Sequence, residues 1–139
     1  MAEKITTHPN LSRTGYEKHI IEQGEHEGFP FIIADNAIGY RCGYVNVPAN
    51  HPWAEKDYDS ITATVHGGLT FCERGTDGSW WVGFDCAHSG DAPDPAIAPA
   101  SVMRSRAMRD YETIKGTDFV RNECRDLCDQ ASAISKATA

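Results

Sequence analysis

The segment that decides the fold is residues 61–91, which read ITATVHGGLTFC, ERGTDG and SWWVGFDCAHSGD in three successive pieces. Two runs in which apolar and polar residues alternate flank the turn-forming residues 73–78, a pattern typical of a β-hairpin. We expect the register that places Phe71 opposite Trp80, because it gathers the apolar side chains of both strands on one face. That face is predicted to be the core side of the sheet.

The opposite face of the hairpin follows from the same register, because successive side chains point to opposite sides of a strand. Its cross-strand pairs are His66 with Asp85, Gly68 with Gly83, Thr70 with Trp81, and Thr64 with Ala87. A glycine pair weakens a strand, so it is typical of a surface that another molecule approaches closely. We therefore predict a ligand-binding face with a glycine floor, lined by Thr70 and Trp81. A slip of two residues, which keeps the faces, would place His66 opposite Gly83 or Ala87.

The predicted site is built on an imidazole beside a carboxylate. Such a carboxylate fixes the tautomer of a histidine and raises the basicity of its other nitrogen. We expect His66 to act as a general base that Asp85 orients. His88 and Asp91, on the loop after the second strand, complete the predicted catalytic set, with His88 assisting a leaving group or an oxyanion. Cys86 falls on the core face, so it is not expected to be a nucleophile.

Two other interpretations of these side chains stay open. An antiparallel sheet commonly leaves one face in water, where a His–Asp pair contributes under about 1 kcal/mol. Two imidazoles and two carboxylates also suit a divalent metal ion such as zinc, although their spacing matches no metal-binding motif. We expect no metal and no other cofactor.

A second candidate group is the basic cluster that follows the proline-rich residues 92–100. Arg104 and Arg106, with Arg109 close by, would hold the oxygens of a phosphorylated ligand if this segment folds over the site. The alternative is a solvated basic stretch on an acidic protein.

The rest of the chain predicts one small α+β domain over residues 1–139, with a mainly antiparallel sheet. Residues 1–13 are expected to be a loose polar arm. Thr14 and Glu17 have the spacing of a capping box, which predicts a short N-terminal helix over residues 16–23. The expected order then continues with strands at 29–34 and 38–47, a loop at 48–60, and strands at 61–72 and 80–86.

The C-terminal helix is predicted from a single apolar stripe, with Thr117 as its N-cap. The stripe consists of Phe119, Val120, Cys124, Leu127, Cys128, Ala131 and Ile134. We expect this helix to cover one face of the sheet.

Composition narrows the classes of function. The net charge of −7 over 139 residues argues against general nucleic-acid binding, which needs basic patches to replace counterions. The N-terminus has no apolar core of a signal peptide, and no apolar run approaches the roughly 20 residues that span a membrane. We therefore expect a cytoplasmic protein whose five cysteines are reduced thiols.

Several motifs together resemble those of a group of small proteins common in phage and prophage genomes. They are HGGLT at residues 66–70, WWVGFDCAHSGD at 80–91, GYRCGYV at 39–45 and the His51-Pro52 loop. The resemblance covers residues 38–94 and the final helix. It implies a phage origin, and with it the cytoplasm of a bacterial host cell, rather than a particular chemistry. Small phage proteins are often counter-defence factors, and some of them destroy or sequester nucleotide signals of bacterial immunity.

These observations lead to one functional hypothesis with two alternatives. We expect a phage-type protein that acts on a small phosphorylated or nucleotide ligand at the His/Asp site. In the enzyme version it is a phosphodiesterase-like hydrolase of a nucleotide immune signal. A binder would sequester the same ligand without cleaving it. An acidic inhibitor would instead block a bacterial defence nuclease through its surface. A homo-oligomer that shares pockets between subunits is compatible with all three.

Overall fold

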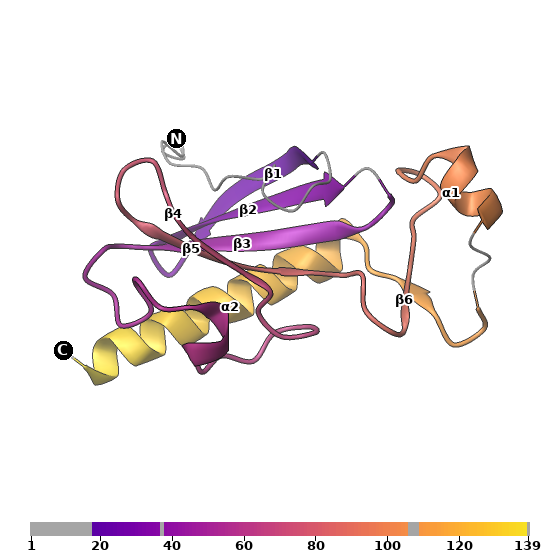
Figure 1. Cartoon of the computed structure of the whole chain (residues 1–139). Coiled ribbons are helices and arrows are strands. Elements are labelled where there is room, and N and C mark those ends of the chain that lie inside the picture. The colour runs from indigo at the N-terminus through magenta and orange to yellow at the C-terminus, as the bar shows by residue number, and fades with distance from the viewer. Residues whose placement is uncertain (1–17, 37, 106–108, 139) are drawn as a thin grey trace.

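The computed structural model of the chain describes residues 18–36, 38–105 and 109–138. The elements are β1 (Lys18–His26), β2 (Phe29–Asn36), β3 (Arg41–Val47), η1 (Tyr58–Ser60), β4 (Phe71–Arg74), β5 (Trp80–Asp85), β6 (Asp91–Ala92), α1 (Ala100–Ser105), β7 (Thr113–Ile114) and α2 (Thr117–Ala137). In the described part, an antiparallel five-stranded sheet has the order β1-β2-β3-β5-β4, and α2 runs across one of its faces (Figure 1). The predicted α+β class, with a C-terminal helix on a mainly antiparallel sheet, is confirmed.

The chain begins, in its described part, with a β1–β2 hairpin instead of a helix. The helix predicted over residues 16–23 is therefore wrong where the structure describes it, while Thr14, Glu17 and the predicted arm over residues 1–13 lie outside the described residues. Glu27 and Gly28 have φ angles of 53° and 82° and form the two-residue turn. Two positive φ angles suit a tight hairpin turn, and pairing with β2 overrides the weak local preference for helix.

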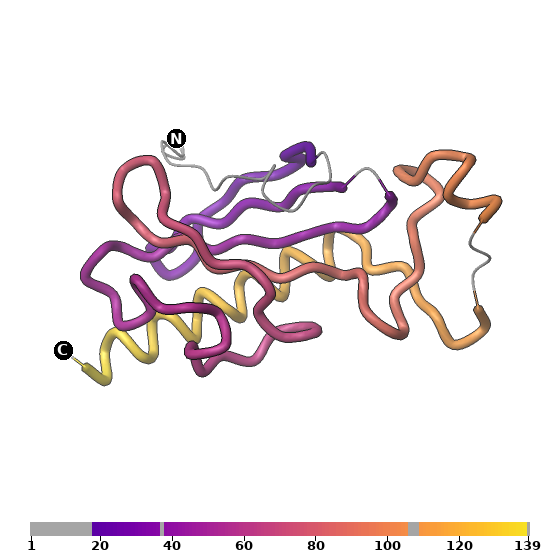
Figure 2. Tube along the Cα trace, viewed as in Figure 1, coloured from indigo at the N-terminus to yellow at the C-terminus, as the bar shows by residue number. Residues whose placement is uncertain are grey.

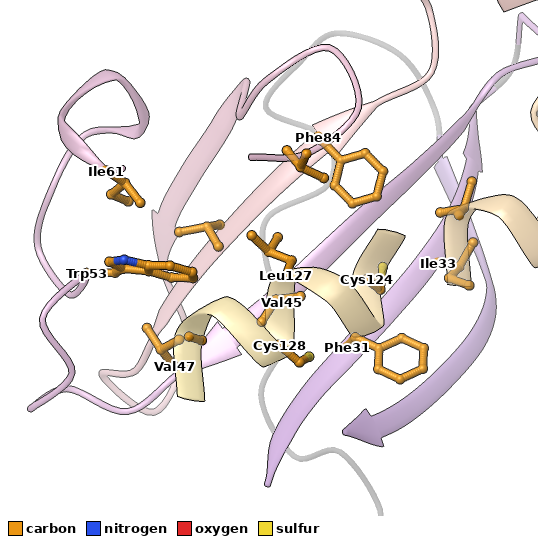
Figure 3. Close-up of a cluster of buried hydrophobic side chains, with 14 of the residues drawn as sticks. Phe31, Ile33, Val45, Val47, Trp53, Ile61, Phe84, Cys124, Leu127 and Cys128 are labelled. Atoms are coloured by element: carbon orange, nitrogen blue, oxygen red, sulfur yellow. The ribbon is translucent and has the colours of Figure 1, made fainter. Parts of the chain in front are cut away.

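The main core lies between α2 and the sheet (Figure 3). The α2 residues in it are Val120, Cys124, Leu127, Cys128 and Ala131. They pack against residues of β2, β3 and β5, namely Phe31, Ile33, Val45, Val47, Val82 and Phe84. Each large apolar side chain that is fully buried contributes about 1.5–3 kcal/mol. The predicted stripe is thus confirmed at its centre, while Phe119 is half-buried and Ile134 is exposed.

The start of α2 differs from the prediction by one residue. Gly116, not Thr117, is the N-cap, and it makes no side-chain capping bond. Thr117 Oγ1 instead accepts a hydrogen bond from Arg41 Nε at 3.2 Å. The hydroxyl therefore ties the helix start to β3.

The predicted register of the central hairpin is wrong. Phe71 pairs with Gly83 instead of Trp80, which is a shift of three residues. An odd shift turns every side chain of one strand to the other face. Strand β4 begins only at Phe71, because the preceding turn contains Gly67 and Gly68 with φ angles of 70° and 80°. The strand expected over residues 61–72 is therefore mostly loop.

The glycine pair and the open Trp81 surface predicted for the ligand-binding face are wrong. Trp81 is fully buried, in a second cluster on the sheet face away from α2. Gly68 lies in the turn before β4, so it does not oppose Gly83. The space above Gly83 is filled by the ring of Tyr44, against which an added Cβ would collide. Close packing of a neighbouring side chain, not ligand access, explains this glycine.

Strand β5 itself follows the prediction. Val82 and Phe84 face the α2 core, and Trp80 packs against it. Cys86 is buried in the same core, as predicted. Burial raises the pKa of the Cys86 thiol, which makes it a poor nucleophile.

Beyond β5 the chain extends past the end of the sheet, where β6 pairs with β7 and α1 projects beyond β6 (Figures 1 and 2). Arg104 is exposed on α1, and Arg106 lies outside the described residues. Arg109 is exposed, and its guanidinium donates to the Tyr111 hydroxyl at 3.2 Å. The expected fold of the basic cluster over the His/Asp residues is therefore not seen for Arg104 or Arg109.

In the described ranges, no helix combines the length and apolar character needed to span a bilayer.

Candidate functional site

His66 pairs with Asp91, not with Asp85 as the predicted register required. Its Nε2 lies 2.8 Å from Asp91 Oδ2 and 3.0 Å from Oδ1. His66 sits in the turn before β4, and Asp91 opens β6, so the pair joins two connections outside the main sheet. An imidazole that donates from Nε2 to a carboxylate keeps Nδ1 as its basic nitrogen.

Asp91 is the buried centre of this pair, with its side chain only 1% exposed. It accepts the backbone N–H of His88 at 3.0 Å and lies 3.1 Å from the ammonium of Lys115. Burial alone would raise the pKa of Asp91, but the hydrogen bonds from His66, His88 and Lys115 outweigh it and hold this pKa below its ordinary value. Asp91 is therefore a fixed negative charge.

A second His–Asp pair lies beside the first. His88 Nε2 is 3.2 Å from Asp85 Oδ1, at ion-pair distance, although the two atoms are not aligned as a hydrogen bond. Asp85 is held by two other donors, the Thr70 hydroxyl at 2.9 Å and the Ala87 N–H at 3.0 Å. Thr70, just before β4, and the backbone of Ala87, just after β5, thus orient the Asp85 carboxylate independently of His88.

The two pairs converge. The rings of His66 and His88 meet edge to face, with centroids 6.1 Å apart. The His88 ring lies directly over Gly67, where an added Cβ would overlap it. Gly67 therefore serves two purposes, since it supplies the positive φ of the turn and leaves room for the imidazole. We call the group of His66, Asp85, His88, Asp91 and Lys115 the paired-histidine site.

Residues of α2 pack against the paired-histidine site and bind its backbone. Phe119, in its first turn, packs edge-on against the His66 ring with centroids 5.1 Å apart, and the Lys115 ammonium lies 5.7 Å from the Phe119 centroid. The Glu123 carboxylate accepts the backbone N–H of His66 at 2.8 Å. These contacts fix both the ring and the backbone of His66.

Arg41 holds the segment that carries Lys115. Its guanidinium donates to the Lys115 carbonyl at 3.2 Å and lies 2.9 Å from the Asp94 carboxylate. Both contacts are largely shielded from water, since the Arg41 and Asp94 side chains are mostly buried. Through these contacts Arg41 on β3 holds the backbone of Lys115, whose ammonium lies against Asp91.

Of the side chains predicted for the site, the structure brings together His66, Asp85, His88 and Asp91, but it pairs His66 with Asp91 and His88 with Asp85. Thr70 is adjacent through Asp85. The residues predicted to bind ligand that the structure places elsewhere, or does not describe, are Gly83, Trp81, Arg104 and Arg106. Gly68 lies in the turn that carries His66, with open space where its Cβ would be.

Lys115 and Glu123 were not expected from the sequence. Lys115 lies in a short polar stretch with no motif, and Glu123 occupies the polar side of an amphipathic helix. The one local signal is that Glu123 precedes Cys124 of the buried stripe, which places it at the edge of the helix face that packs on the sheet.

A cluster of side chains with metal-ligand spacing lies elsewhere in the described part. His26, Glu27 and Asp129 offer one ligand atom each within 4.8 Å, on the exposed β1–β2 turn and on α2. In the paired-histidine site, by contrast, the Nε2 atom of each imidazole already faces a carboxylate. A metal ion bound by the paired-histidine site would therefore have to compete with two existing His–Asp contacts.

A pocket adjoins the site on the sheet face away from α2. Its volume is about 220 Å³, and Asp85, Thr70 and Ala87 form the wall next to His88.

Comparisons of the chain with protein-family models, curated proteins and solved structures found no match.

Proposed function

We propose that this protein acts on a small phosphorylated ligand of nucleotide type, cleaving a phosphoric ester by acid–base catalysis at the paired-histidine site. The observation that carries the proposal is the convergence of two His–Asp pairs beside a lysine. Paired imidazoles, one as base and one as acid, can move the two protons that ester hydrolysis requires. A neighbouring ammonium can offset the negative charge that grows on the phosphoryl oxygens.

The roles follow from which nitrogen is already engaged. His66 donates from Nε2 to Asp91, so Nδ1 accepts the proton of the attacking water. The water oxygen forms a bond to phosphorus while the bond from phosphorus to the leaving oxygen breaks. The imidazolium of His88, stabilised by Asp85, gives its proton to that leaving oxygen. Both histidines then return to their starting protonation states by exchange with solvent.

This assignment corrects the partners expected from the sequence. Asp91, not Asp85, orients the base, and Asp85 orients the acid. Each proton transfer of this kind is worth about 10²–10⁴-fold in rate. Replacing either imidazole should therefore lower the rate of hydrolysis severely, whereas replacing exposed residues around them should change this rate little.

The resemblance to phage proteins supports a counter-defence setting, in which the ligand is a nucleotide signal of bacterial immunity. Sequestration is the second candidate, and the 220 Å³ pocket beside Asp85 favours it because a binder needs a cavity rather than a proton relay. Under that alternative His66, His88 and Lys115 grip the phosphate and no bond is broken.

The test is incubation of the protein with a panel of cyclic mono- and dinucleotides, with products read by chromatography. We expect cleavage of at least one compound, and a loss of about 10²-fold or more in His66→Asn and in His88→Asn. His26→Asn is the matched control, because His26 Nε2 also lies 2.7 Å from a carboxylate, that of Asp129, in a pair outside the paired-histidine site. It should retain full activity.

Other outcomes decide between the alternatives. Intact nucleotide recovered after heat denaturation, with no product, would replace hydrolysis by sequestration. If no nucleotide is bound or cleaved, and reversal of surface acidic clusters abolishes counter-defence activity while His66→Asn and His88→Asn keep it, the protein is an acidic inhibitor and the proposal is wrong.

A further inference from the structure

The pocket beside Asp85 is a second feature of the molecule that the proton relay does not use. It opens on the sheet face opposite α2, between the ends of several strands. Its lining residues are Lys18, Asn36, Ile38, Cys42, Tyr44, Thr70, Phe71, Phe84, Asp85 and Ala87. The pocket therefore combines an aromatic and apolar floor with a polar rim.

The floor is rigid and apolar. Tyr44 and Phe71 are buried and packed edge to face, with ring centroids 5.1 Å apart, and Cys42 is buried beside them. Burial raises the pKa of the Tyr44 phenol and, to about 11, that of the Cys42 thiol, so both groups stay neutral at physiological pH. Such a floor suits the flat face of an aromatic heterocycle.

The wall is chemically one-sided at Asp85. An ionised carboxylate only accepts hydrogen bonds and offers about four acceptor positions. Thr70 and the Ala87 N–H occupy two of these positions, and His88 lies against the same oxygen as Ala87. Because Asp85 lines the pocket, its remaining acceptor positions suit a ligand that brings a donor, such as an amino group, and they repel a carbonyl oxygen placed at the same point.

We propose that this pocket binds the amino-bearing edge of a nucleobase, so that the protein prefers cytosine-, adenine- or guanine-type ligands to uracil-type ligands. The choice of a nucleotide rests on the proposed function. A volume of 220 Å³ suits one base, since pockets that hold whole drug-sized ligands measure about 300–1,000 Å³. Recognition of a cytosine amino group by an aspartate is the pairing that base-reading proteins use.

The placement of the pocket joins it to the paired-histidine site through a single residue. Asp85 lines the pocket and also contacts His88, so a base seated on the floor would carry its sugar and phosphate toward the two imidazoles. Lys18 also lines the pocket and adds a positive charge to it. The two sites thus form one path along a ligand.

The experiment uses nucleosides, which lack phosphate and so report on the pocket alone. Cytidine has an amino group at C4 and an acceptor at N3, where uridine has an oxo group and an N3–H donor. Guanosine and inosine differ only by one amino group, so they isolate its contribution, and guanosine should bind more tightly. In ¹H–¹⁵N NMR titrations of the full chain, cytidine should shift the amides of Thr70, Phe71 and Ala87, and uridine should bind at least about tenfold more weakly. Equal affinities, or no shifts at these amides, would overturn the proposal.

A variant sharpens the result. Asp85→Asn replaces one acceptor oxygen by a donor, so the preference for cytidine over uridine should shrink by at least about tenfold or reverse. Asp59→Asn, an exposed change on η1, is the control and should keep the preference. The comparison of nucleosides on the unaltered protein stands even if Asp85→Asn does not fold.

Failure of this proposal is separable from failure of the proposed function. If nucleosides bind with the expected preference while no nucleotide is cleaved, the pocket assignment holds and hydrolysis does not. If nucleotides are cleaved and His66→Asn is inactive, but cytidine and uridine behave alike, hydrolysis holds and the base assignment falls.

Discussion

Substitution of Asp91 by asparagine tests the centre of the paired-histidine site. The variant keeps the shape of the side chain but removes the charge that His66 and Lys115 contact at 2.8 and 3.1 Å. It also places an amide where an acceptor is needed, because an asparagine has one oxygen and one NH2 group. At least one of the donors His66, His88 and Lys115 then loses its partner.

The cost can be estimated from burial. Removing one member of a fully buried ion pair costs about 3–5 kcal/mol. Asp91 is 1% exposed, but His66 and Lys115 are 22% and 16% exposed, so water recovers part of the loss. We therefore expect Asp91→Asn to lower the free energy of unfolding by about 2–3 kcal/mol at pH 7, which is about 6–12 °C in Tm for a chain of this length.

The sign of the pH dependence follows from the lowered pKa of Asp91. Its ordinary value is 3.8, so the stabilisation is fully present above pH 3.8 and is lost as the pH falls through the lower pKa of the folded state. The unfolding curves of the wild-type protein and Asp91→Asn should accordingly converge in strong acid.

Urea denaturation measures the energy, and long-range ¹H–¹⁵N NMR of the imidazoles measures the tautomer. In the wild-type protein the neutral form of His66 should carry its proton on Nε2, and in Asp91→Asn this preference should be lost. Asp59→Asn is the control for loss of an exposed carboxylate. A variant with unchanged stability and an unchanged His66 tautomer would refute the assigned His66–Asp91 geometry.

Two further predictions concern the turn and the long loop. Gly67→Ala and Gly68→Ala both force an alanine to positive φ, which costs about 1–2 kcal/mol each. Only the Cβ of Gly67→Ala pushes on the His88 ring, so in urea unfolding this variant should lose about 1–3 kcal/mol more stability than Gly68→Ala. Equal losses would contradict the packing of His88 over Gly67. His51 is buried and donates from Nε2 to the Ala131 carbonyl, and burial lowers its pKa below 6.5. The stability that neutral His51 contributes is therefore fully present above pH 6.5 and declines as the pH falls below 6.5. A His51→Gln variant should lose that part of the pH dependence in denaturation between pH 5 and 7, and an identical pH profile would show that His51 does not titrate with folding.

Much of the fold could be predicted because it is written in neighbouring residues. The alternation of Trp80, Val82 and Phe84 gives β5 its core face, and the spacing of Cys124, Leu127 and Cys128 gives α2 its buried stripe. Each pattern repeats with the period of its own element, so it needs no knowledge of distant segments. These assignments are confirmed.

The hairpin register could not be obtained in the same way. Val65 and Leu69 alternate as a strand would and do contact the core, but they reach it from a loop. The alternation is interrupted by two consecutive glycines with positive φ, which end the extended backbone before β4. Apolar spacing shows which side chains are buried, and it does not show whether a strand or a loop buries them.

The candidate site divides along the same line. The sequence by itself determined that His66, Asp85, His88 and Asp91 would gather, because they flank one hairpin. Only the tertiary structure decided which imidazole meets which carboxylate, and it added Lys115 from a segment 24 residues beyond Asp91. Local patterns fix the face and period of an element, whereas side-chain partners depend on where loops close and on what distant segments pack beneath them.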